Sequence, residues 1–352
     1  MQASAQHGRG AATNPPNRFV RLTLAPDPDI SPDESPSPKT IFLQDKTRTA
    51  IATNESPDIG FEASLNPYRG CEHGCVYCYA RPFHEYLGFS AGLDFETRIM
   101  VKSDMPELLR NELASPKWQP KTISISGVTD AYQPIERRLK ITRRCLEILA
   151  ECRNPVGIVT KNALVKRDAD LLSHLAANRA AVVCLSITTL NNELASIMEP
   201  RASSPRARLD AIGALTAAGV PTGVMVAPVI PGLNDEEMFA ILSAAAKAGA
   251  TFAAYVPLRL PLAVADLFQQ WLDQHFPDRK EKILNRIRSL RGGKLNNSEF
   301  GKRFHGEGIW DDQFRTMFEL ACRKMGINEK FPKLSTAAFV RPNRSSEQMT
   351  LF

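Results

Sequence analysis

The sequence predicts an α/β fold with a parallel sheet, and the order of its apolar and helical segments supports this prediction. Short apolar segments alternate with helical segments between residues 61 and 260. Repeated strand–helix units of this length give parallel strands joined by right-handed crossovers. A curved, partly closed barrel and an open doubly wound sheet both fit this alternation. In either arrangement, the functional residues are expected at the carboxyl ends of the strands.

The expected strands are short and rich in apolar or β-branched residues. Residues 121–126 (KTISIS) alternate polar and apolar side chains, which is typical of a strand. Most of the other segments are apolar throughout, as strands buried on both faces are. In chain order, the expected strands are Phe61–Tyr68, Arg98–Lys102, Lys121–Ser126, Val156–Thr160, Ala181–Thr188, Thr222–Val229 and Thr251–Val256.

Helices are expected between these strands and after the last of them. Gly219 and Gly249 follow two of the helical segments, and Asn234 with Asp235 opens the second of these two. The helices between strands are expected over about Met105–Ser115, Ile135–Cys152, Lys166–Ala177, Pro205–Ala218 and Asn234–Ala248. Past Pro261 the pattern is helical only, over Val264–His275, Lys280–Arg291 and Ile309–Met325.

These patterns divide the chain into four parts. Residues 1–40 are rich in Pro, Ser, Asn and Ala and are expected to form a flexible leader. Residues 41–260 hold the α/β region, residues 261–340 a helical extension packed on it, and residues 341–352 a mobile tail. The first ten residues lack the apolar stretch of a signal peptide, and no run of about 18 apolar residues occurs. We therefore expect a cytoplasmic protein that does not enter a membrane, and a monomer.

Positive charge is concentrated in one part of the chain. The net charge is +6, but residues 279–303 alone carry nine Lys or Arg and two Glu, so the rest of the chain has a net charge of −1. Such a regional excess indicates an anionic partner, although a solvated helix face would give the same pattern. Ile283, Ile287 and Leu290 recur at helical spacing and should face the barrel, leaving the charges outside. The predicted phosphate contacts are Arg286, Arg288 and Arg291.

Three of the seven cysteines lie within eight residues, in the order Cys71, Cys75 and Cys78. This C-x3-C-x2-C spacing in a glycine-containing loop lets three thiolates hold one [4Fe–4S] cluster. A cube of four irons with three protein ligands leaves one iron open to an outside ligand. Zinc bound by the three thiolates and His73 or His84 is the alternative, but no second C-x2-C pair supplies the usual partner ligands. The other cysteines are single, lie among apolar neighbours and are expected to be buried thiols: Cys145, Cys152, Cys184 and Cys322.

The motif and its surroundings resemble the radical S-adenosylmethionine (SAM) superfamily. The segments NPYRGCEHGCVYCYARP, GVTDAYQP, VTKN and APVIPGLND are similar, more narrowly, to the spore photoproduct lyase family of DNA-repair enzymes. The similarity spans about residues 61–260, and the cysteine motif is its most specific part. The resemblance implies a partial (β/α)6 barrel. It also implies that S-adenosylmethionine binds the open iron through its amino and carboxylate groups and is cleaved to a 5′-deoxyadenosyl radical.

The resemblance also suggests roles for individual residues. Tyr77 and Tyr79 flank the third cysteine, as tyrosines implicated in binding and hydrogen transfer do in the lyases, although both side chains could instead pack the loop. Four residues at strand ends match cofactor-contacting positions: Thr129, Asp130, Lys161 and Ser186. A hydroxyl and an ammonium there can hold the carboxylate and ribose of the cofactor. Asp130 could equally serve as a helix N-cap, and the backbone of residues 227–230 is expected to line the adenine.

The sequence departs from the lyases at one position that matters for the reaction. In the lyases, a cysteine near the end of the corresponding strand returns a hydrogen atom to the product radical. Here residues 124–130 read SISGVTD and contain no cysteine. The lesion-repair reaction therefore does not follow from the resemblance alone. Cys184 should point to the same side of its strand as Ser186, which makes it the alternative thiol of this chain.

The leading functional hypothesis is a radical SAM enzyme that abstracts hydrogen from DNA or another nucleic acid and receives its electron from a separate donor. A radical SAM enzyme that modifies a small molecule or a protein is the first alternative. A non-catalytic iron–sulfur protein that binds nucleic acid is the second.

The last five residues, QMTLF, resemble the pentapeptide by which bacterial repair and replication proteins bind the DNA sliding clamp. In this interpretation, Leu351 and Phe352 fill an apolar pocket and Gln348 donates and accepts hydrogen bonds. Met349 stands where the usual peptide has leucine, an exchange that conserves volume. A terminal segment that ends by chance in two apolar residues is the alternative.

Overall fold

A computed structural model describes residues 6–20 and 39–343. Its main sheet has seven strands in the order β10-β9-β8-β7-β6-β3-β2. β2 (Ile51–Thr53) is antiparallel to its neighbour at one edge. The other six are parallel and adjacent in chain order: β3 (Ala63–Leu65), β6 (Ile123–Ile125), β7 (Val156–Thr160), β8 (Ala181–Ser186), β9 (Thr222–Val229) and β10 (Phe252–Pro257). A doubly wound sheet would reverse its strand order at a switch point, so the predicted partial (β/α)6 barrel is confirmed.

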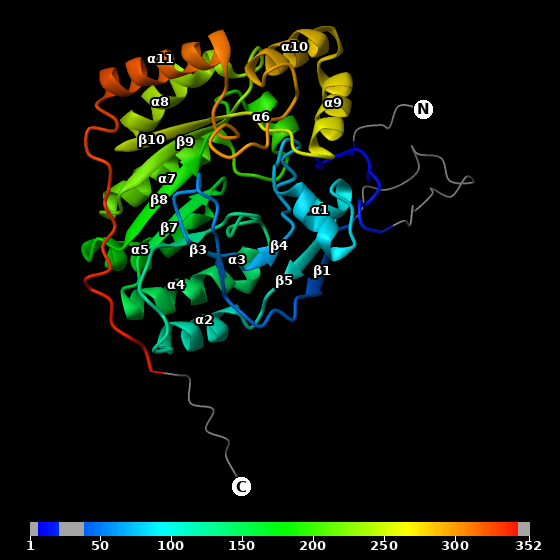
Figure 1. Ribbon diagram of the computed structural model, residues 1–352. Coiled ribbons are helices and arrows are strands. Elements are labelled where there is room, and N and C mark those ends of the chain that lie inside the picture. Colours follow the sequence, from blue (N-terminus) through cyan, green and yellow to red (C-terminus); the bar gives the residue numbers. More distant parts are fainter. Residues whose placement is uncertain (1–5, 21–38, 344–352) are drawn as a thin grey trace.

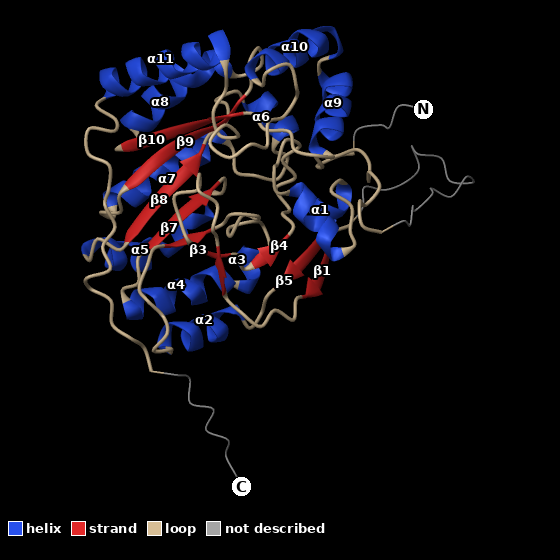
Figure 2. Ribbon diagram, viewed as in Figure 1, coloured by secondary structure: helices blue, strands red, loops and turns tan. Residues whose placement is uncertain are grey.

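Helices cover the outer face of this curved sheet (Figures 1 and 2). They are α2 (Met105–Ala114), α4 (Ile141–Cys152), α5 (Ala169–Ala177), α7 (Pro205–Ala217) and α8 (Met238–Lys247). Fully buried strand residues such as Ile125, Leu185 and Val224 share one hydrophobic core with Leu146 and Ile241 of these helices. The helices thereby bury the outer face and leave the strand ends to form a site.

The predicted strand Phe61–Tyr68 is broken at Asn66-Pro67, where proline cannot donate a ladder hydrogen bond. Its second part, β4 (Tyr68–Arg69), belongs to a separate three-stranded sheet of order β1-β5-β4. β1 (Ile41–Gln44) and β5 (Arg98–Val101) complete that sheet. The strand predicted over Arg98–Lys102 therefore exists, but it lies outside the barrel.

The helix predicted over Ile135–Cys152 is also interrupted. α3 (Glu136–Leu139) ends at Lys140, whose φ of 53° is left-handed, and α4 begins directly after it. The buried carboxylate of Glu136 accepts hydrogen bonds from the amides of Thr142 (3.1 Å) and Arg143 (3.4 Å). It thereby satisfies first-turn amides of α4 that a continuous helix would pair internally.

Two further predicted helices begin with a 3-10 turn: η3 (Ala163–Asp168) precedes α5, and η4 (Asp235–Glu237) precedes α8. Neither β1 and β2 nor several short helical elements were predicted, among them η2 (Arg81–Leu87), α1 (Leu93–Thr97) and α6 (Asn192–Met198). Both η2 and α1 lie beside the cysteine loop in the chain, so part of its surroundings did not follow from the sequence pattern.

The chain continues with α9 (Val264–His275), η5 (Pro277–Arg279), α10 (Lys280–Leu290) and α11 (Gly308–Met325). Ile283 and Ile287 of α10 share a second hydrophobic core with Val76 and Tyr77 of the cysteine loop. Leu290 is buried as well, so the predicted apolar face of α10 is confirmed. α11 lies beside α8 (Figure 1). Within the part of the chain that the structure describes, no helix combines the length and apolar character needed to span a bilayer.

Candidate active site: a cysteine loop with two flanks

The loop that holds the three cysteines follows β3 and β4. Cys71 and Cys75 are each 7% exposed, Cys78 is half-buried, and none of the three forms a disulfide. The amide of Cys71 donates to the carbonyl of Phe95 (2.9 Å), and the amide of Cys78 donates to that of Cys75 (3.2 Å). The loop is thus folded back on itself, with free thiols at each motif position.

A buried ion pair between Arg81 and Glu96 holds this loop in place. Arg81 donates to the carbonyls of Cys75 (2.9 Å) and Gly74 (3.2 Å) and pairs with Glu96 at 2.5 Å. Both charged side chains are fully buried. Buried charges are tolerated only when the remaining polar atoms are also satisfied, and here backbone carbonyls of the loop meet that need.

Residues 6–20 pack on the loop at Gly10 and on the neighbouring η2 and α1 through other residues. The amides of Gly10 (3.1 Å) and Ala11 (2.9 Å) donate to the carboxylate of Glu96. A Cβ on Gly10 would stand 1.7 Å from the carbonyl oxygen of Gly74, so only glycine fits there. For residues 6–20 this packing differs from the expected flexible leader, because the segment gains its order from partners about 85 positions later in the chain.

The two histidines of the zinc alternative have other neighbours. His73 lies 3.4 Å from Asp130 through Nδ1 and 3.1 Å from Asn162 through Nε2. His84 stacks on Phe89 and meets the edge of Phe95. Across residues 6–20 and 39–343, no three His, Cys, Asp or Glu side chains are grouped to share a single ion. An iron–sulfur cube needs no such grouping, since each thiolate binds a different iron.

The first flank of the loop contains Lys161 and Ser186, which the structure brings together at the ends of β7 and β8. The Lys161 ammonium donates to the Ser186 hydroxyl (2.5 Å) and to the carbonyl of Ala227 (3.0 Å). It lies 5.7 Å from the ring centre of Tyr77 and 3.6 Å from the carboxylate of Glu199. One cation, one hydroxyl and one carbonyl therefore meet beside the second and third cysteines.

Glu199 is the centre of this flank. Its carboxylate accepts hydrogen bonds from Thr188 (2.6 Å), from the Tyr77 hydroxyl and from Arg208. Both Glu199 and Arg208 are 1% exposed. Burial alone would raise the pKa of Glu199, but Arg208 and Lys161 outweigh it and lower the pKa to about 2. Tyr77 is 7% exposed and bonded at its hydroxyl, so it packs the loop and orients this network.

Thr129 and Asp130 form a second polar cluster around the start of the loop. The Thr129 hydroxyl donates to the carbonyl of Gly70 (2.6 Å). Asp130 accepts hydrogen bonds from the hydroxyl of Thr160 (2.7 Å) and the amides of Lys161 (2.8 Å) and Tyr132 (2.9 Å). Burial opposes its ionisation, yet His73 and these donors lower the pKa of Asp130 to about 2. Both oxygens of Asp130 are engaged in joining strand ends to the cysteine loop.

The second flank of the loop contains Tyr79, Arg259, Phe304, Arg303 and Phe300. Tyr79 differs from Tyr77 in its exposure and in its hydrogen-bond partner. Its side chain is 46% exposed, and its hydroxyl donates to the carbonyl of Gly127 (2.6 Å). The guanidinium carbon of Arg259 lies 5.6 Å from its ring centre. Tyr79 is thus the one of the two predicted tyrosines that an incoming molecule can touch.

Residues 124–130, where the lyases have a cysteine, contain no thiol. Ser126 accepts a hydrogen bond from the amide of Ala131 (3.0 Å), and Ser124 is 9% exposed. Cys184 lies on β8 between its ladder partners Val159 and Gly223 and is 7% exposed. Burial raises its pKa to about 12, so it is a neutral thiol near pH 7. The other scattered cysteines are buried and free, as expected.

One predicted phosphate contact is wrong. Arg291 is 2% exposed and donates to the carbonyls of Pro257 (3.0 Å), Leu258 and His305. It anchors the chain after β10 to the loop after α10 and cannot reach a ligand. Helical spacing suggested an outward charge, but Arg291 follows the last helical residue and turns inward.

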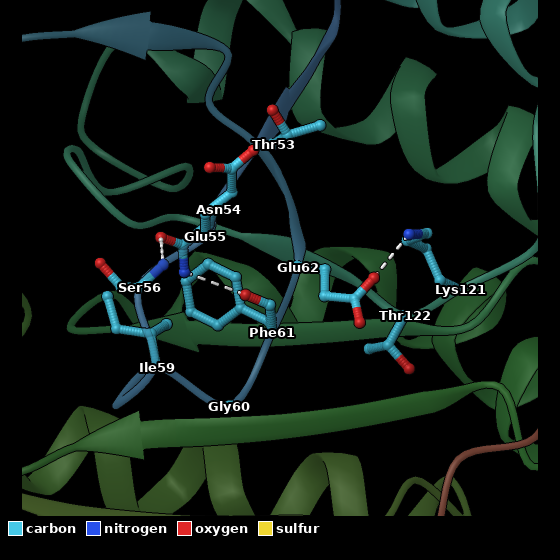
Figure 3. Close-up of a pocket in the computed structure, with 10 residues that line it drawn as sticks. All are labelled: Thr53, Asn54, Glu55, Ser56, Ile59, Gly60, Phe61, Glu62, Lys121 and Thr122. Carbon is cyan, nitrogen blue, oxygen red and sulfur yellow. Dashed lines mark hydrogen bonds and ion pairs between the residues drawn. The ribbon is translucent and has the colours of Figure 1, made fainter.

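A pocket of about 700 Å³ lies away from the cysteine loop. Figure 3 shows Glu62 and Lys121, which form an ion pair of 2.6 Å, beside the pocket, with residues 53–56 and 59–61 across from them. Glu62 precedes β3 and Lys121 precedes β6, so the pocket lies at the amino ends of these strands. It contains none of the predicted site residues and is not assigned to the active site.

The sequence pattern did not predict Arg81, Glu96, Glu199 and Arg208, which hold the loop and its first flank in place. Other charged residues lie close to three of them in the sequence, such as Asp94 and Arg98 beside Glu96, so the local pattern does not single them out. Arg259, also not predicted, lies two residues past the end of the last strand, at the edge where function was expected.

Comparison with known proteins agrees with the fold. The model of the radical SAM superfamily matches residues 65–245, about half of the chain. An uncharacterized protein of Mycobacterium tuberculosis (strain H37Rv) is 37% identical over 68% of this chain and 71% of its own. The radical SAM Nalpha-GlyT isomerase of Pseudomonas phage M6 is 28% identical over 54% of this chain and 38% of its own.

The structure of spore photoproduct lyase complexed with dinucleoside spore photoproduct has a similar fold. The TM-score is 0.59 at 17% identity, and the alignment covers 81% of this chain and 80% of the lyase. Radical SAM enzymes use a [4Fe–4S] cluster and S-adenosylmethionine, and these are the cofactors of this enzyme. With its parallel half-barrel, its three-cysteine loop and the matching family model, this chain belongs to the radical SAM superfamily.

Proposed function

We propose that Cys71, Cys75 and Cys78 hold the [4Fe–4S] cluster of this enzyme. Three free thiols on one loop, with no disulfide and no fourth ligand from His73 or His84, support this assignment. Burial raises the pKa of each thiol, so the thiolates depend on the positive charge of the metal. When bound, the cluster supplies the electron that cleaves S-adenosylmethionine to a 5′-deoxyadenosyl radical.

Lys161 and Ser186 are proposed to hold the polar groups of S-adenosylmethionine. Their mutual hydrogen bond and the carbonyl of Ala227 orient both side chains before any ligand arrives. Tyr77, whose hydroxyl is bonded to Glu199, is proposed to position Lys161 rather than to react. Thr129 and Asp130 are proposed to keep the loop in register with the strand ends. Tyr79, being exposed, is left to meet the substrate.

The substrate is proposed to be a nucleic acid, and in particular DNA. The observation that supports this most directly is the second flank, where aromatic and cationic side chains alternate in the order Tyr79, Arg259, Phe304, Arg303 and Phe300. Such surfaces stack bases and neutralise phosphates. A fold shared with a lyase solved with a dinucleoside lesion is consistent with it. The lesion-repair reaction itself is not proposed, because residues 124–130 supply no thiol.

Radical modification of a small molecule or a protein is the competing function. An anaerobic assay of 5′-deoxyadenosine formation separates the two, with single-stranded, duplex and ultraviolet-treated DNA added in turn. Nucleosides and a peptide mixture serve as the matched additions. The proposal expects DNA to raise the rate of formation or to be altered itself. Stimulation by the nucleosides or peptides alone would contradict it.

A docking role is proposed for Gln348, Met349, Leu351 and Phe352 at the end of the chain. These residues lie outside those that the structure describes, so only the sequence supports the resemblance to a clamp-binding peptide. A ligand of the DNA sliding clamp would work on DNA, in the cytoplasm, which agrees with the proposed substrate.

A further inference from the structure

Arg259 differs from the other inward-facing arginines near the cysteine loop. Arg81 is paired with Glu96, Arg208 with Glu199, and Arg291 is bonded to backbone carbonyls. Within residues 6–20 and 39–343, no carboxylate lies within ion-pair distance of Arg259, and its buried Nε has no hydrogen-bond acceptor. This half-buried guanidinium is therefore left without an anionic partner among the described residues.

Two aromatic rings hold Arg259 in place. Its guanidinium carbon lies 5.6 Å from the ring centre of Tyr79 and 4.6 Å from that of Phe304. The neighbouring cation, Arg303, is already neutralised by Asp58, at 2.5 and 2.8 Å. The carboxylate of Asp58 is therefore already paired, and the two rings offer Arg259 only the weaker cation–π attraction.

A partly desolvated cation is unfavourable unless an anion or hydrogen-bond acceptors replace its water. Burial, and then the proximity of Arg303, lower the pKa of Arg259, yet a guanidinium stays charged in proteins. The side chain therefore selects an anionic ligand, and the planar guanidinium suits a phosphate or a carboxylate.

The position of Arg259 shows which anion fits. It directly follows Leu258, just past the carboxyl end of β10 and on the same barrel edge as the cysteine loop. On this flank the side chains of Tyr79 and Phe300 are 46% and 57% exposed. Exposed rings beside a cation offer stacking surfaces for bases next to the phosphate between them. A carboxylate of S-adenosylmethionine would need no such rings.

We propose that Arg259 binds a phosphodiester of the nucleic-acid substrate next to the reacting nucleotide, with Tyr79 and Phe300 as stacking surfaces for the adjacent bases. This inference rests on the proposed function and assigns the residues that recognise its substrate. Arg259 is a binding residue and takes no part in the chemistry.

The test measures binding of a single-stranded oligonucleotide to the cluster-loaded enzyme at about 50 to 200 mM salt. The variants are Arg259→Gln, Arg259→Lys and, as a matched control, Arg323→Gln, which removes an exposed charge in the last turn of α11. Arg259→Gln is expected to weaken binding about tenfold at the lower salt concentration. It should also reduce the slope of log affinity against log salt by about one. Arg259→Lys should keep the slope and lose part of the affinity, and Arg323→Gln should match the parent.

Two further measurements separate phosphate binding from a structural role and from a role toward the cofactor. The thermal midpoint of Arg259→Gln should equal or exceed that of the parent, because an unpaired, half-buried charge is removed; a marked fall would assign Arg259 a structural role instead. The concentration of S-adenosylmethionine giving half-maximal cleavage, without nucleic acid, should be unchanged. A several-fold rise would identify the cofactor carboxylate as the ligand and overturn the inference.

Failure of the inference and failure of the proposed function give different results. If the parent binds the oligonucleotide with a normal salt slope and Arg259→Gln binds identically, the inference fails while a nucleic-acid substrate stands. If the parent does not bind nucleic acid at any salt concentration, the proposed function fails and the inference falls with it.

Discussion

The two tyrosines that flank Cys78 lie in opposite environments. Tyr77 is 7% exposed and donates its hydroxyl to Glu199, whose carboxylate is shared with Arg208, Thr188 and Lys161. Tyr79 is 46% exposed and lies beside Arg259, which has no carboxylate partner among the described residues. One flank of the cysteine loop is electrostatically complete, and the other keeps an unpaired cation.

This difference separates two tasks within one loop. A complete network orients its members before a ligand arrives, which lowers the cost of holding a cofactor in one geometry. An incomplete network gains its missing interaction only when a ligand supplies the counter-charge. We therefore associate the Tyr77 flank with S-adenosylmethionine and the Tyr79 flank with the substrate. The variants of Glu199, Arg259, Tyr77 and Tyr79 test that division.

The largest expected effect comes from removing the cluster that both flanks need. Changing Cys71, Cys75 or Cys78 to Ala should remove most of the iron and all formation of 5′-deoxyadenosine, because a cube held by two thiolates is poorly retained. Iron and sulfide analysis of anaerobically reconstituted protein measures this directly. Cys145→Ala, at a buried cysteine of α4, is the control and should keep close to four irons per chain. Stoichiometric zinc without iron in the parent would contradict the assignment.

The next largest effect is a difference in the free energy of unfolding between variants of the two flanks. Glu199→Ala should lower the free energy of unfolding by roughly 3–5 kcal/mol, because it leaves Arg208 buried without its partner. Arg259→Gln should change it by at most about 1 kcal/mol. Denaturant titration of both variants and the parent gives the comparison. Equal losses in the two variants would remove the distinction between a complete and an incomplete flank.

Acid should destabilise the Tyr77 flank in a defined range. The pKa of Glu199 is lowered to about 2 in the folded chain from its ordinary value of 4.5, so ionised Glu199 stabilises the fold above about pH 4.5. That contribution is lost as the pH falls through 4.5 toward 2. The thermal midpoint of the parent should fall across this range, and that of Glu199→Gln should fall less. Parallel curves for the two proteins would show that Glu199 is not responsible.

Removing the hydroxyl of Tyr77 should lower the stability of the fold more than removing that of Tyr79, but the difference is smaller than that between the Glu199 and Arg259 variants. Tyr77→Phe removes a buried hydrogen bond to a carboxylate and should cost about 1.5–3 kcal/mol of stability. Tyr79→Phe removes a hydrogen bond from an exposed side chain to a carbonyl and should cost about 0.5–1 kcal/mol. Thermal or denaturant unfolding resolves a difference of this size. A larger loss at Tyr79 would reverse the proposed roles.

The smallest effect on the enzyme is expected at the end of the chain. Deleting residues 348–352 should leave cofactor cleavage and oligonucleotide binding unchanged, while co-purification with the DNA sliding clamp is lost. Restoring the five residues in scrambled order is the matched control for length. Clamp binding by the truncated protein, or none by the full chain, would end the docking proposal.

Sequence patterns predicted those features of the fold and the site that depend on residues close together in the chain. The alternation of strands and helices, the apolar face of α10 and the motif of three cysteines follow from local spacing. The break at Lys140 could not be predicted, because it depends on the Glu136 side chain capping α4 from outside the helix. The Arg81–Glu96 and Glu199–Arg208 pairs were missed for the same reason. Their residues are visible in the sequence, but which charge meets which is decided only by folding.

The contact between residues 6–20 and the cysteine loop has a consequence for the order of assembly. Gly10 and Ala11 are synthesised about 85 residues before Glu96, the group they bind. They therefore have no partner until η2, α1 and the loop have formed, and closing a segment of that length is slow compared with local folding. During that interval the part of the loop at Gly74, against which Gly10 later packs, is uncovered. We therefore expect residues 6–20 to pack onto the cysteine loop late in folding, after the loop itself has formed.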